Sequence, residues 1–348
     1  MNICFVLNDF ETEKCGTSVV MMRRAAERGH TVYVMDVGDF YFSSSAAISL
    51  HVREVPKDIT LETGPKFLDA LQTGEIEPKA ITVKELDVLF VRNNPTEEGV
   101  ERKWAQQSGI AFGRMIQRQG VLVLNDAYAM SFAYIDKLYF EELPQEIKPK
   151  SVITRKKEDV MKFYEENGNK MVLKPLEGSG GQGVFLVEEG ETNLNQIIDT
   201  LLLEGYIIAQ EFLPKASEGD VRVVMMNGRL LEEDGGSALI RRKGAAGEFR
   251  NNISTGGSAE LAEMTPEIQH IVNVVAPKLI RDGLFLVGLD VVDDKLIEIN
   301  VLSPGGLETF ETLGLTDFTG TIIEAIERKV DYKKRHPTTP NEVLATME

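Results

Sequence analysis

Short apolar runs alternate with stretches of helical periodicity over the first 125 residues. The helical patterns span Thr17–Arg28 and Glu98–Gln119, and the strand-like runs span Ile3–Leu7, Thr31–Val37, Val88–Val91 and Val121–Leu124. Because strands that alternate with helices usually build βαβ units, this pattern predicts a parallel sheet covered by helices. An aromatic-rich helical stretch follows and closes with Pro144 and Pro149, so we place a domain boundary between residues 125 and 126.

The rest of the chain predicts two further units and a tail. In residues 126–210 we expect helices near 156–167 and 192–203 and strands at 151–154, 171–175, 184–187 and 206–210. In residues 211–330 we expect helices at 265–281 and 317–329, a glycine- and arginine-rich loop at 241–257, and strands at 220–226, 229–233, 284–292 and 295–301. Residues 331–348 are polar and contain prolines, which predicts a frayed, solvated tail.

Composition narrows the class of partner. The 348 residues carry a net charge of −17, which disfavours nucleic acid and anionic membrane surfaces as partners. Cys4 and Cys15 lack the paired spacing of a disulfide framework or a zinc site. No run of about 18 apolar residues and no basic leader is present, so we expect a cytoplasmic protein that acts on small molecules.

The sharpest motif is a glycine-rich segment, Lys174-Pro-Leu-Glu-Gly178-Ser-Gly180-Gly181-Gln-Gly183. Its glycine spacing matches the dinucleotide fingerprint, but that fingerprint opens a helix, whereas here the strand-like run Val184–Val187 follows. A glycine loop between two strands is instead typical of a flap whose backbone N–H groups close over phosphates. Lys174 would add a positive charge; an ordinary glycine-rich hairpin is the alternative.

A second motif, Gly288-Leu-Asp290-Val-Val-Asp-Asp-Lys-Leu-Ile-Glu298-Ile-Asn300, predicts a hairpin. Strand alternation puts Glu298 and Asn300 on one face, and the turn at Asp293–Asp294 folds Asp290 back beside them. Two carboxylates and an amide oxygen suit a hard cation such as Mg²⁺. A solvated acidic face is the alternative, although an unpaired Asp290 within an apolar strand would be costly.

A third motif clusters arginines in a strongly acidic chain. Arg241, Arg242 and Arg250 lie within the segment 240–257, and Arg222 follows Gly219-Asp220-Val. Such a cluster favours a pocket for anionic substrates and a transferring phosphoryl group. A flexible, solubilising loop is the alternative.

Taken in this order, the motifs resemble those of the ATP-grasp superfamily and, within it, of the bacterial glutathione synthetases. The resemblance reaches from the first strand to about residue 329 and is strongest in Leu173–Val187, Ala209–Pro214, Gly219–Arg222 and Val287–Pro304. It implies an α/β and α+β architecture in which a Rossmann-like, parallel-sheet domain (residues 1–125) precedes a two-lobed ATP-grasp fold. The flap would belong to the small lobe (126–210), and the metal site to the C-terminal lobe (211–330).

The resemblance also implies roles for individual residues. ATP binding would fall to Lys137, Lys174, Gly180, Gly181, Gln210, Glu211, Phe212, Leu213 and Asp220. The metal ligands would be Asp290, Glu298 and Asn300, and the groups around the transferred phosphoryl and the acyl-phosphate would be Arg222, Arg250 and Asn252. Substrate binding would involve Arg92, Arg241, Ser303, Gly305 and Gly306. The implied cofactors are ATP and Mg²⁺, as two ions, with Mn²⁺ able to substitute.

The reaction so implied is ATP-dependent ligation of a carboxylate to an amine, most closely glutathione synthesis from γ-glutamylcysteine and glycine. Three departures concern the substrate side. Arg92-Asn-Asn-Pro95 stands where the family has Arg-Lys-Asp-Pro, and Ser258 stands where it has Arg. Gly305-Gly-Leu-Glu-Thr309 stands where it has Thr-x-Ile-Arg-Glu. They leave open a related peptide or amino-acid ligase with another acid or amine. A nucleotide-binding regulatory module without turnover and a nicotinamide oxidoreductase are alternatives from other classes. Homo-oligomers are implied by the family likeness alone.

Overall fold

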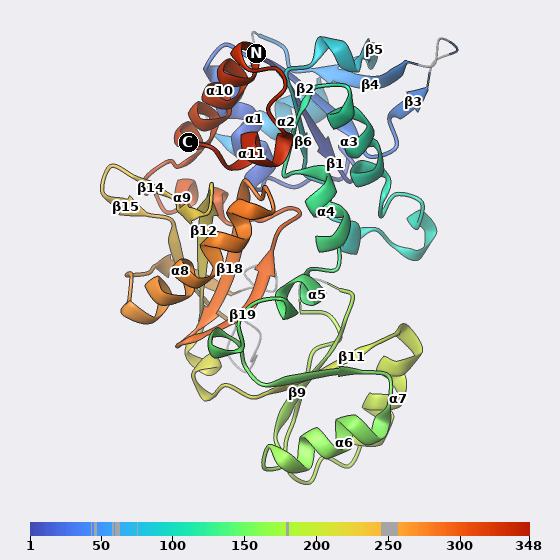
Figure 1. Cartoon of the computed structure of the whole chain (residues 1–348), viewed down its shortest axis with the longest axis vertical. Helices are drawn as coiled ribbons and strands as arrows, with labels where there is room; N and C mark the ends of the chain where they lie inside the picture. The colour runs from blue at the N-terminus through green and yellow to red at the C-terminus, as the bar shows by residue number, and fades with distance from the viewer. Residues whose placement is uncertain are drawn as a thin grey trace.

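Three main sheets follow one another along the long axis of the molecule in a computed structural model (Figure 1). The structure describes residues 1–42, 44, 47–57, 59, 63–74, 76–178, 181–244 and 257–348. An N-terminal sheet lies at one end, a small lobe lies at the other, and the sheet of the C-terminal lobe lies between them.

The N-terminal sheet has seven strands in the order β3-β4-β2-β1-β6-β7, with β5 paired to β4. The strands are β1 (Asn2–Leu7), β2 (Thr31–Asp36), β3 (Phe40–Phe42), β4 (Ile48–Glu54), β5 (Lys79–Thr82), β6 (Val88–Val91) and β7 (Leu122–Leu124). Its β2-β1-β6-β7 part is parallel, as the alternation predicted. The sheet is nevertheless mixed, because β4 runs antiparallel to β2, β3 and β5, a meander that the sequence pattern did not predict.

Helices cover both faces of this sheet, because the side chains of its central strand from Ile3 to Leu7 are apolar and buried. Ile3, Phe5 and Leu7 of β1 pack in one buried cluster with residues of α1 (Thr17–Glu27) and α2 (Gly64–Thr73). Cys4 and Val6 point to the other cluster, which contains residues of α3 (Ser108–Arg118) and α4 (Ala127–Ala133). The helix predicted over 98–119 is shorter than expected, since a 3-10 helix, Val100–Arg102, precedes α3.

The small lobe is an antiparallel four-stranded sheet in the order β10-β9-β11-β8. Its strands are β8 (Ser151–Thr154), β9 (Met171–Pro175), β10 (Phe185–Val187) and β11 (Ile207–Glu211), and its helices are α6 (Lys157–Glu166) and α7 (Leu194–Glu204). Eleven residues between Val160 and Ala209 form a buried cluster of its own. The lobe therefore has a core separate from the rest of the molecule.

The C-terminal lobe is built on the strand order β17-β16-β12-β18-β19, with β13 paired to β12. The strands are β12 (Asp220–Met226), β13 (Arg229–Leu230), β16 (Leu239–Lys243), β17 (Ser258–Leu261), β18 (Leu286–Val292) and β19 (Lys295–Asn300), with a separate pair β14 (Glu232–Glu233) and β15 (Gly236–Ser237). Its helices are α8 (Pro266–Arg281) and α9 (Leu307–Thr312), and α5 (Asp136–Glu141) lies against β19. Residues 241–243, expected in a loop, belong to strand β16.

The expectation of a frayed tail is wrong. Helix α10 spans Thr319–Arg335, and the last residues form α11, Asn341–Thr346, whose Leu344 and Ala345 are fully buried. Asn341 explains the docking, because its side chain accepts a bond from the N–H of Val123 and donates one to its carbonyl, at 2.9 and 2.8 Å. Two apolar residues and one paired amide hold this end of the chain in place. Among the described residues, none of the helices is both long and apolar enough to cross a bilayer.

Candidate active site

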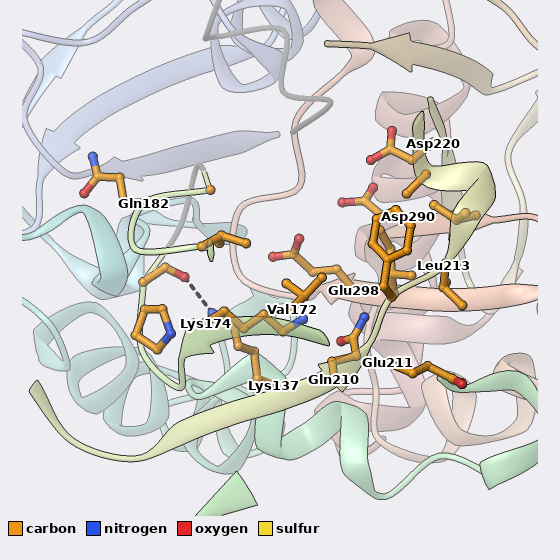
Figure 2. A pocket seen from close by; sticks show the side chains of 18 of the residues that line it. Lys137, Val172, Lys174, Gln182, Gln210, Glu211, Leu213, Asp220, Asp290 and Glu298 are labelled. Carbon is orange, nitrogen blue, oxygen red and sulfur yellow. Dashed lines mark hydrogen bonds between the residues drawn. The ribbon is translucent and has the colours of Figure 1, made fainter. Parts of the chain in front are cut away.

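A cavity of about 160 Å³ lies between the small lobe and the C-terminal lobe (Figure 2). It is lined by the ends of β9 and β11 on one side and by β12, β18 and β19 on the other. Eight of the nine residues predicted to bind ATP line it: Lys137, Lys174, Gly181, Gln210, Glu211, Phe212, Leu213 and Asp220. Gly180, the ninth, lies outside the described residues.

Two lysines from different elements reach this cavity. Lys174 is the penultimate residue of β9, and Lys137 lies in the first turn of α5. The Lys137 ammonium donates to the carbonyl of Gly178 at 2.7 Å, which ties α5 to the glycine-rich segment (Figure 2). Burial lowers the pKa of Lys174, an effect that the neighbouring Glu298 carboxylate opposes. Anionic phosphates placed here would gain from both charges.

The segment after β11 supplies an apolar wall. The carboxylate of Glu211 accepts a bond from the N–H of Lys150 at 2.7 Å and points away from the cavity (Figure 2). Phe212 and Leu213 continue the lining, with Val172, Val292 and Ile297. A slot lined by apolar side chains suits a flat heteroaromatic ring.

Strand register aligns charged side chains across the C-terminal sheet. Arg222 of β12 lies opposite Asp290 of β18, which in turn lies opposite Glu298 of β19. Residues that are partners across strands share one face, so the three side chains form a row. The Arg222 guanidinium donates to both oxygens of Asp290, at 2.5 and 3.0 Å.

A second arginine completes a buried network. Arg242 of β16 lies opposite Asp220 and donates to both of its oxygens at 2.8 Å, and it also reaches Asp290 at 3.0 Å. Burial would raise the pKa of Asp290, but the two guanidinium groups hold it well below its usual range. Burial, and then the charge of Asp290, raise the pKa of Asp220 to about 6, against the pull of Arg242. Asp290 therefore keeps its negative charge to a lower pH than Asp220 does.

The predicted metal ligands lie together, but one of them is already engaged. Asn300 donates to Asp290 at 3.4 Å, and Glu298 is the cross-strand partner of Asp290. No cluster of three or more His, Cys, Asp or Glu side chains suited to a metal occurs within the described part of the chain. The donor set, two carboxylates and an amide oxygen, still fits a hard cation, with nucleotide phosphates as the remaining ligands. The role of these three residues as metal ligands stays a prediction.

Asp136 is a site residue that the sequence reasoning missed. It begins α5, next to Lys137, and lines a second cavity that adjoins the first. Burial raises the pKa of Asp136 to about 7, although Lys137 opposes this rise. Asp136 thus contributes less negative charge near neutral pH than its type suggests.

The second cavity has a volume of about 380 Å³ and meets the first at four residues: Gly181, Arg242, Asp290 and Glu298. Of the residues predicted for catalysis and substrate binding, it is lined by Arg222, Ser303, Gly305 and Gly306, and the third predicted metal ligand, Asn300, lies here too. The carbonyl of Gly305 accepts a bond from Arg222 at 2.7 Å. The loop after β19 is thereby fixed over the charged row.

Two predicted substrate residues lie elsewhere. Arg92 is 3% exposed and donates to Ser18 Oγ and to the carbonyl of Pro304, so it supports the loop from behind instead of lining the cavity. Arg241 lies opposite Val221, on the face of β16 that Arg242 does not share, and lines a separate cavity with Lys215 and Thr265. The structure therefore places Arg241 outside the second cavity, and Arg242 lines that cavity instead. Arg250 and Asn252 lie outside the described residues.

Strand alternation narrows the choice to one of two successive arginines, and the register of β16 against β12 then selects Arg242. Asp220 and Arg222 share a face of β12, so whichever of two successive arginines lies opposite Asp220 must share that face too. The remaining lining residues that were missed, Asn94, Thr96, Glu97 and Glu308, come from loops and a helix that only the fold brings together. For these the sequence offered only the departures from the family pattern around residues 93–94 and 305–309.

A family model described as the prokaryotic glutathione synthetase ATP-grasp domain matches residues 136–314, and one for the N-terminal domain of the same family matches residues 1–130. The chain belongs to the prokaryotic glutathione synthetase family. It is accordingly an ATP-dependent ligase with an ATP-grasp fold, as the order of the motifs predicted.

Curated members of the glutathione synthetase family resemble the chain over nearly its whole length. The glutathione synthetase of Vibrio parahaemolyticus serotype O3:K6 is 32% identical over 319 residues, which cover 91% of this chain and 94% of that protein. The glutathione synthetase of Escherichia coli K12 is 29% identical over 319 residues, with the same coverage of both chains.

Solved structures share the fold at lower identity. The macrocyclase MdnC bound with precursor peptide MdnA from Microcystis aeruginosa MRC gives a TM-score of 0.60 at 14% identity, covering 94% of this chain and 100% of that one. The D-cycloserine synthetase DcsG gives 0.59 at 13% identity, covering 94% and 99%. At these identities the likeness supports the ATP-grasp fold of the family and carries nothing about substrates.

Proposed function

We propose that the chain joins γ-glutamylcysteine to glycine at the expense of ATP, forming glutathione, ADP and phosphate. The observation that carries this is the meeting of two cavities at Asp290, Glu298, Arg242 and Gly181. One cavity has the lysines and apolar wall that a nucleotide needs, and the other has the arginines that a carboxylate needs. The full-length match to glutathione synthetases supports the identity of the substrates.

The chemistry follows from the low reactivity of a carboxylate. A carboxylate oxygen of the dipeptide attacks the γ-phosphorus of ATP, and the bond from that phosphorus to the β-phosphate oxygen breaks. The amine nitrogen of glycine then attacks the acyl carbon, the bond from that carbon to the phosphate oxygen breaks, and the nitrogen loses a proton. Such transfers depend on positioning and charge neutralisation more than on covalent catalysis.

Residues of this chain have defined tasks in that scheme. Lys137 and Lys174 hold the phosphates, and Arg222 and Arg242 neutralise the oxygens of the transferred group where the two cavities meet. The glycine-rich segment, tied to α5 through Gly178, excludes water that would otherwise hydrolyse the intermediate.

Magnesium is part of the proposal. When bound by Glu298, Asn300 and Asp290, Mg²⁺ would neutralise charge on the nucleotide phosphates. The family likeness implies that two Mg²⁺ ions bind and that Mn²⁺ can substitute for them. Since Asp290 also holds two guanidinium groups, Glu298 is the ligand whose loss should matter most.

The test is phosphate release from Mg-ATP with γ-glutamylcysteine and glycine, with product mass read in parallel and a panel of other dipeptides and amino acids for comparison. Glutathione formation is the expected result, and Glu298→Gln should lower turnover and raise the Mg²⁺ concentration that turnover needs, because the ion loses a carboxylate ligand. Phosphate release with other pairs alone would keep the ligase chemistry and reject the substrates. That outcome would favour the second candidate, a related ligase with another acid or amine substrate. The departures from the family pattern at 93–94, 258 and 305–309 support this candidate.

A further inference from the structure

The second cavity has two chemically different ends. At the end shared with the nucleotide cavity, Asp290 and Glu298 lie beside Arg222 and Arg242. The rest of its lining does not reach the nucleotide cavity and includes Asn94, Glu97 and Glu308. A substrate whose reacting carboxylate lies at the shared end would place its remote group here.

Negative charge dominates the remote end. Arg222 and Arg242 are the basic side chains among the described residues that line this cavity, and both are paired with Asp220 or Asp290. Glu97 and Glu308 line the same cavity, and Glu97 accepts a bond from Asn94 at 3.2 Å. A further cation, Arg92, is buried under the loop and interacts electrostatically with Glu13 and Glu308. A carboxylate without an adjacent ammonium would be repelled at this end, whereas a cationic group would be attracted.

Glu308 is held in a fixed orientation with one oxygen to spare. Its Oε2 accepts bonds from Thr17 Oγ1 at 2.7 Å and from the N–H of Gly306 at 3.1 Å. Thr17 Oγ1 in turn accepts from the N–H of Leu307 at 3.0 Å. Its Oε1 accepts no hydrogen bond from the residues that the structure describes, so it is available to a ligand.

The loop leaves room beside this carboxylate. A Cβ built on Gly305 would meet no described atom within 4 Å, so the glycine faces open space. The departure of this loop from the family pattern, with Glu308 where that pattern has an arginine, therefore changes both the size and the charge of the remote end.

We propose that Glu308, assisted by Glu97, binds a cationic group at the end of the acid substrate remote from its reacting carboxylate. This rests on the proposed function, and for γ-glutamylcysteine the group is the α-ammonium of the glutamyl residue. Glu308 then determines specificity by selecting acids that carry an ammonium and disfavouring those that carry only a second carboxylate there.

Two analogues separate the groups at that end. In 4-aminobutanoylcysteine the ammonium is kept and the α-carboxylate is absent, whereas in glutarylcysteine a carboxylate is kept and the ammonium is absent. The wild-type protein should favour the first over the second by about 10- to 100-fold in kcat/KM with glycine, the range for one charge-assisted hydrogen bond. Dissociation constants of the two acids, measured with a non-hydrolysable ATP analogue, should fall in the same order.

Glu308→Gln tests the charge alone, because an amide oxygen can still accept from Thr17 and Gly306. The preference should fall to a few-fold while the KM for glycine stays unchanged, and Glu308→Arg should reverse the preference. Glu311→Gln is the matched control: Glu311 lies one turn further along α9 and pairs with Arg23 at 2.9 Å, so its loss should leave the preference intact.

Three results would overturn the assignment. The first is a wild-type protein that binds glutarylcysteine as tightly as 4-aminobutanoylcysteine or more tightly. The others are an unchanged preference in Glu308→Gln and an effect of that substitution confined to the KM for glycine. An unchanged preference would mean that Glu308 only braces its own loop. If no acid supports phosphate release, the proposed function fails instead. The dissociation constants of the two analogues then decide the role of Glu308, and equal binding of both, or binding of neither, would count against that role.

Discussion

Arg242 is the residue on which the buried charge network depends. Replacing it with leucine leaves Asp220 without its bidentate partner and Asp290 with one guanidinium group instead of two. Removing one member of a buried ion pair costs about 3–5 kcal/mol, so Arg242→Leu should lower the free energy of unfolding by that amount and abolish turnover. Urea unfolding and phosphate release measure the two effects.

Arg241 provides the control for that substitution. It is the preceding residue of β16, but its side chain is 37% exposed and lies on the opposite face, 4.0 Å from Glu260. Arg241→Leu should change the free energy of unfolding by about 0.5 kcal/mol or less and leave turnover in place. Similar losses in both variants would contradict the assignment of Arg242 to the site.

These two arginines also show where residue-level prediction ends. Asp290, Glu298 and Asn300 could be grouped from the sequence, because their hairpin has a visible turn and strand side chains alternate. Choosing between Arg241 and Arg242 required the register of β16 against β12, and Asp220 and Arg242 are far apart in the chain. Arg92 was misplaced for a related reason, since its position behind the loop at Pro304 depends on how two domains pack.

At the scale of elements, helix α11 should be necessary for stability. Asn341→Ala removes the side chain that pairs with both backbone groups of Val123 and with Asp126. Because each buried backbone group left unpaired costs about 1–3 kcal/mol, we expect a loss of about 2–4 kcal/mol in the free energy of unfolding. Glu342→Ala, at the exposed next position, should be nearly neutral. An Asn341→Ala protein as stable as the wild type would restore the interpretation of a loose tail.

Periodicity predicted most of the other elements, because their apolar faces are buried within one layer. It predicted β18, β19 and α8 to within about two residues of their observed bounds. It failed for α11, whose polar sequence hides the burial of Leu344 and Ala345 against elements far away in the chain. It also missed β3, β4 and β5, which pair with one another at an edge of the sheet beyond the parallel strands.

At the scale of the molecule, the N-terminal sheet and the C-terminal lobe share their buried clusters, whereas the small lobe has its own. Helix α10, expected to belong to the C-terminal lobe, lies against α1, where Arg28 pairs with Glu324 and Glu327. Asn125 joins the two parts further, since its side chain bonds the backbone of Leu286 and Val301. The order of motifs predicted three lobes. It did not predict that α10 packs against the N-terminal domain, because contacts between remote segments leave no local pattern in the sequence.

Lys329 lies where these parts join and should make stability depend on pH. Its ammonium is fully buried over Phe285 and donates to Asn227 at 2.8 Å and to the carbonyl of Met347. Burial lowers the pKa of Lys329 from its ordinary value of 10.5 to about 7, so between these pH values the unfolded chain binds more protons than the folded one. The contribution of Lys329 to stability therefore rises with pH from about 7 to about 10.5, by up to roughly 5 kcal/mol, and is least favourable below pH 7.

The difference between the wild type and Lys329→Met isolates this effect, because burial also raises the pKa of Cys4 and lowers that of Lys333 in both proteins. Relative to the methionine variant, the wild type should gain free energy of unfolding as the pH rises from 7 to 10. Lys334→Met, on the same helix with an exposed side chain that pairs with Asp87 at 3.2 Å, provides the comparison for a lysine at the surface. A difference between wild type and Lys329→Met that stayed constant over this range would mean that Asn227, Met347 and Phe285 stabilise the ammonium enough to cancel its burial.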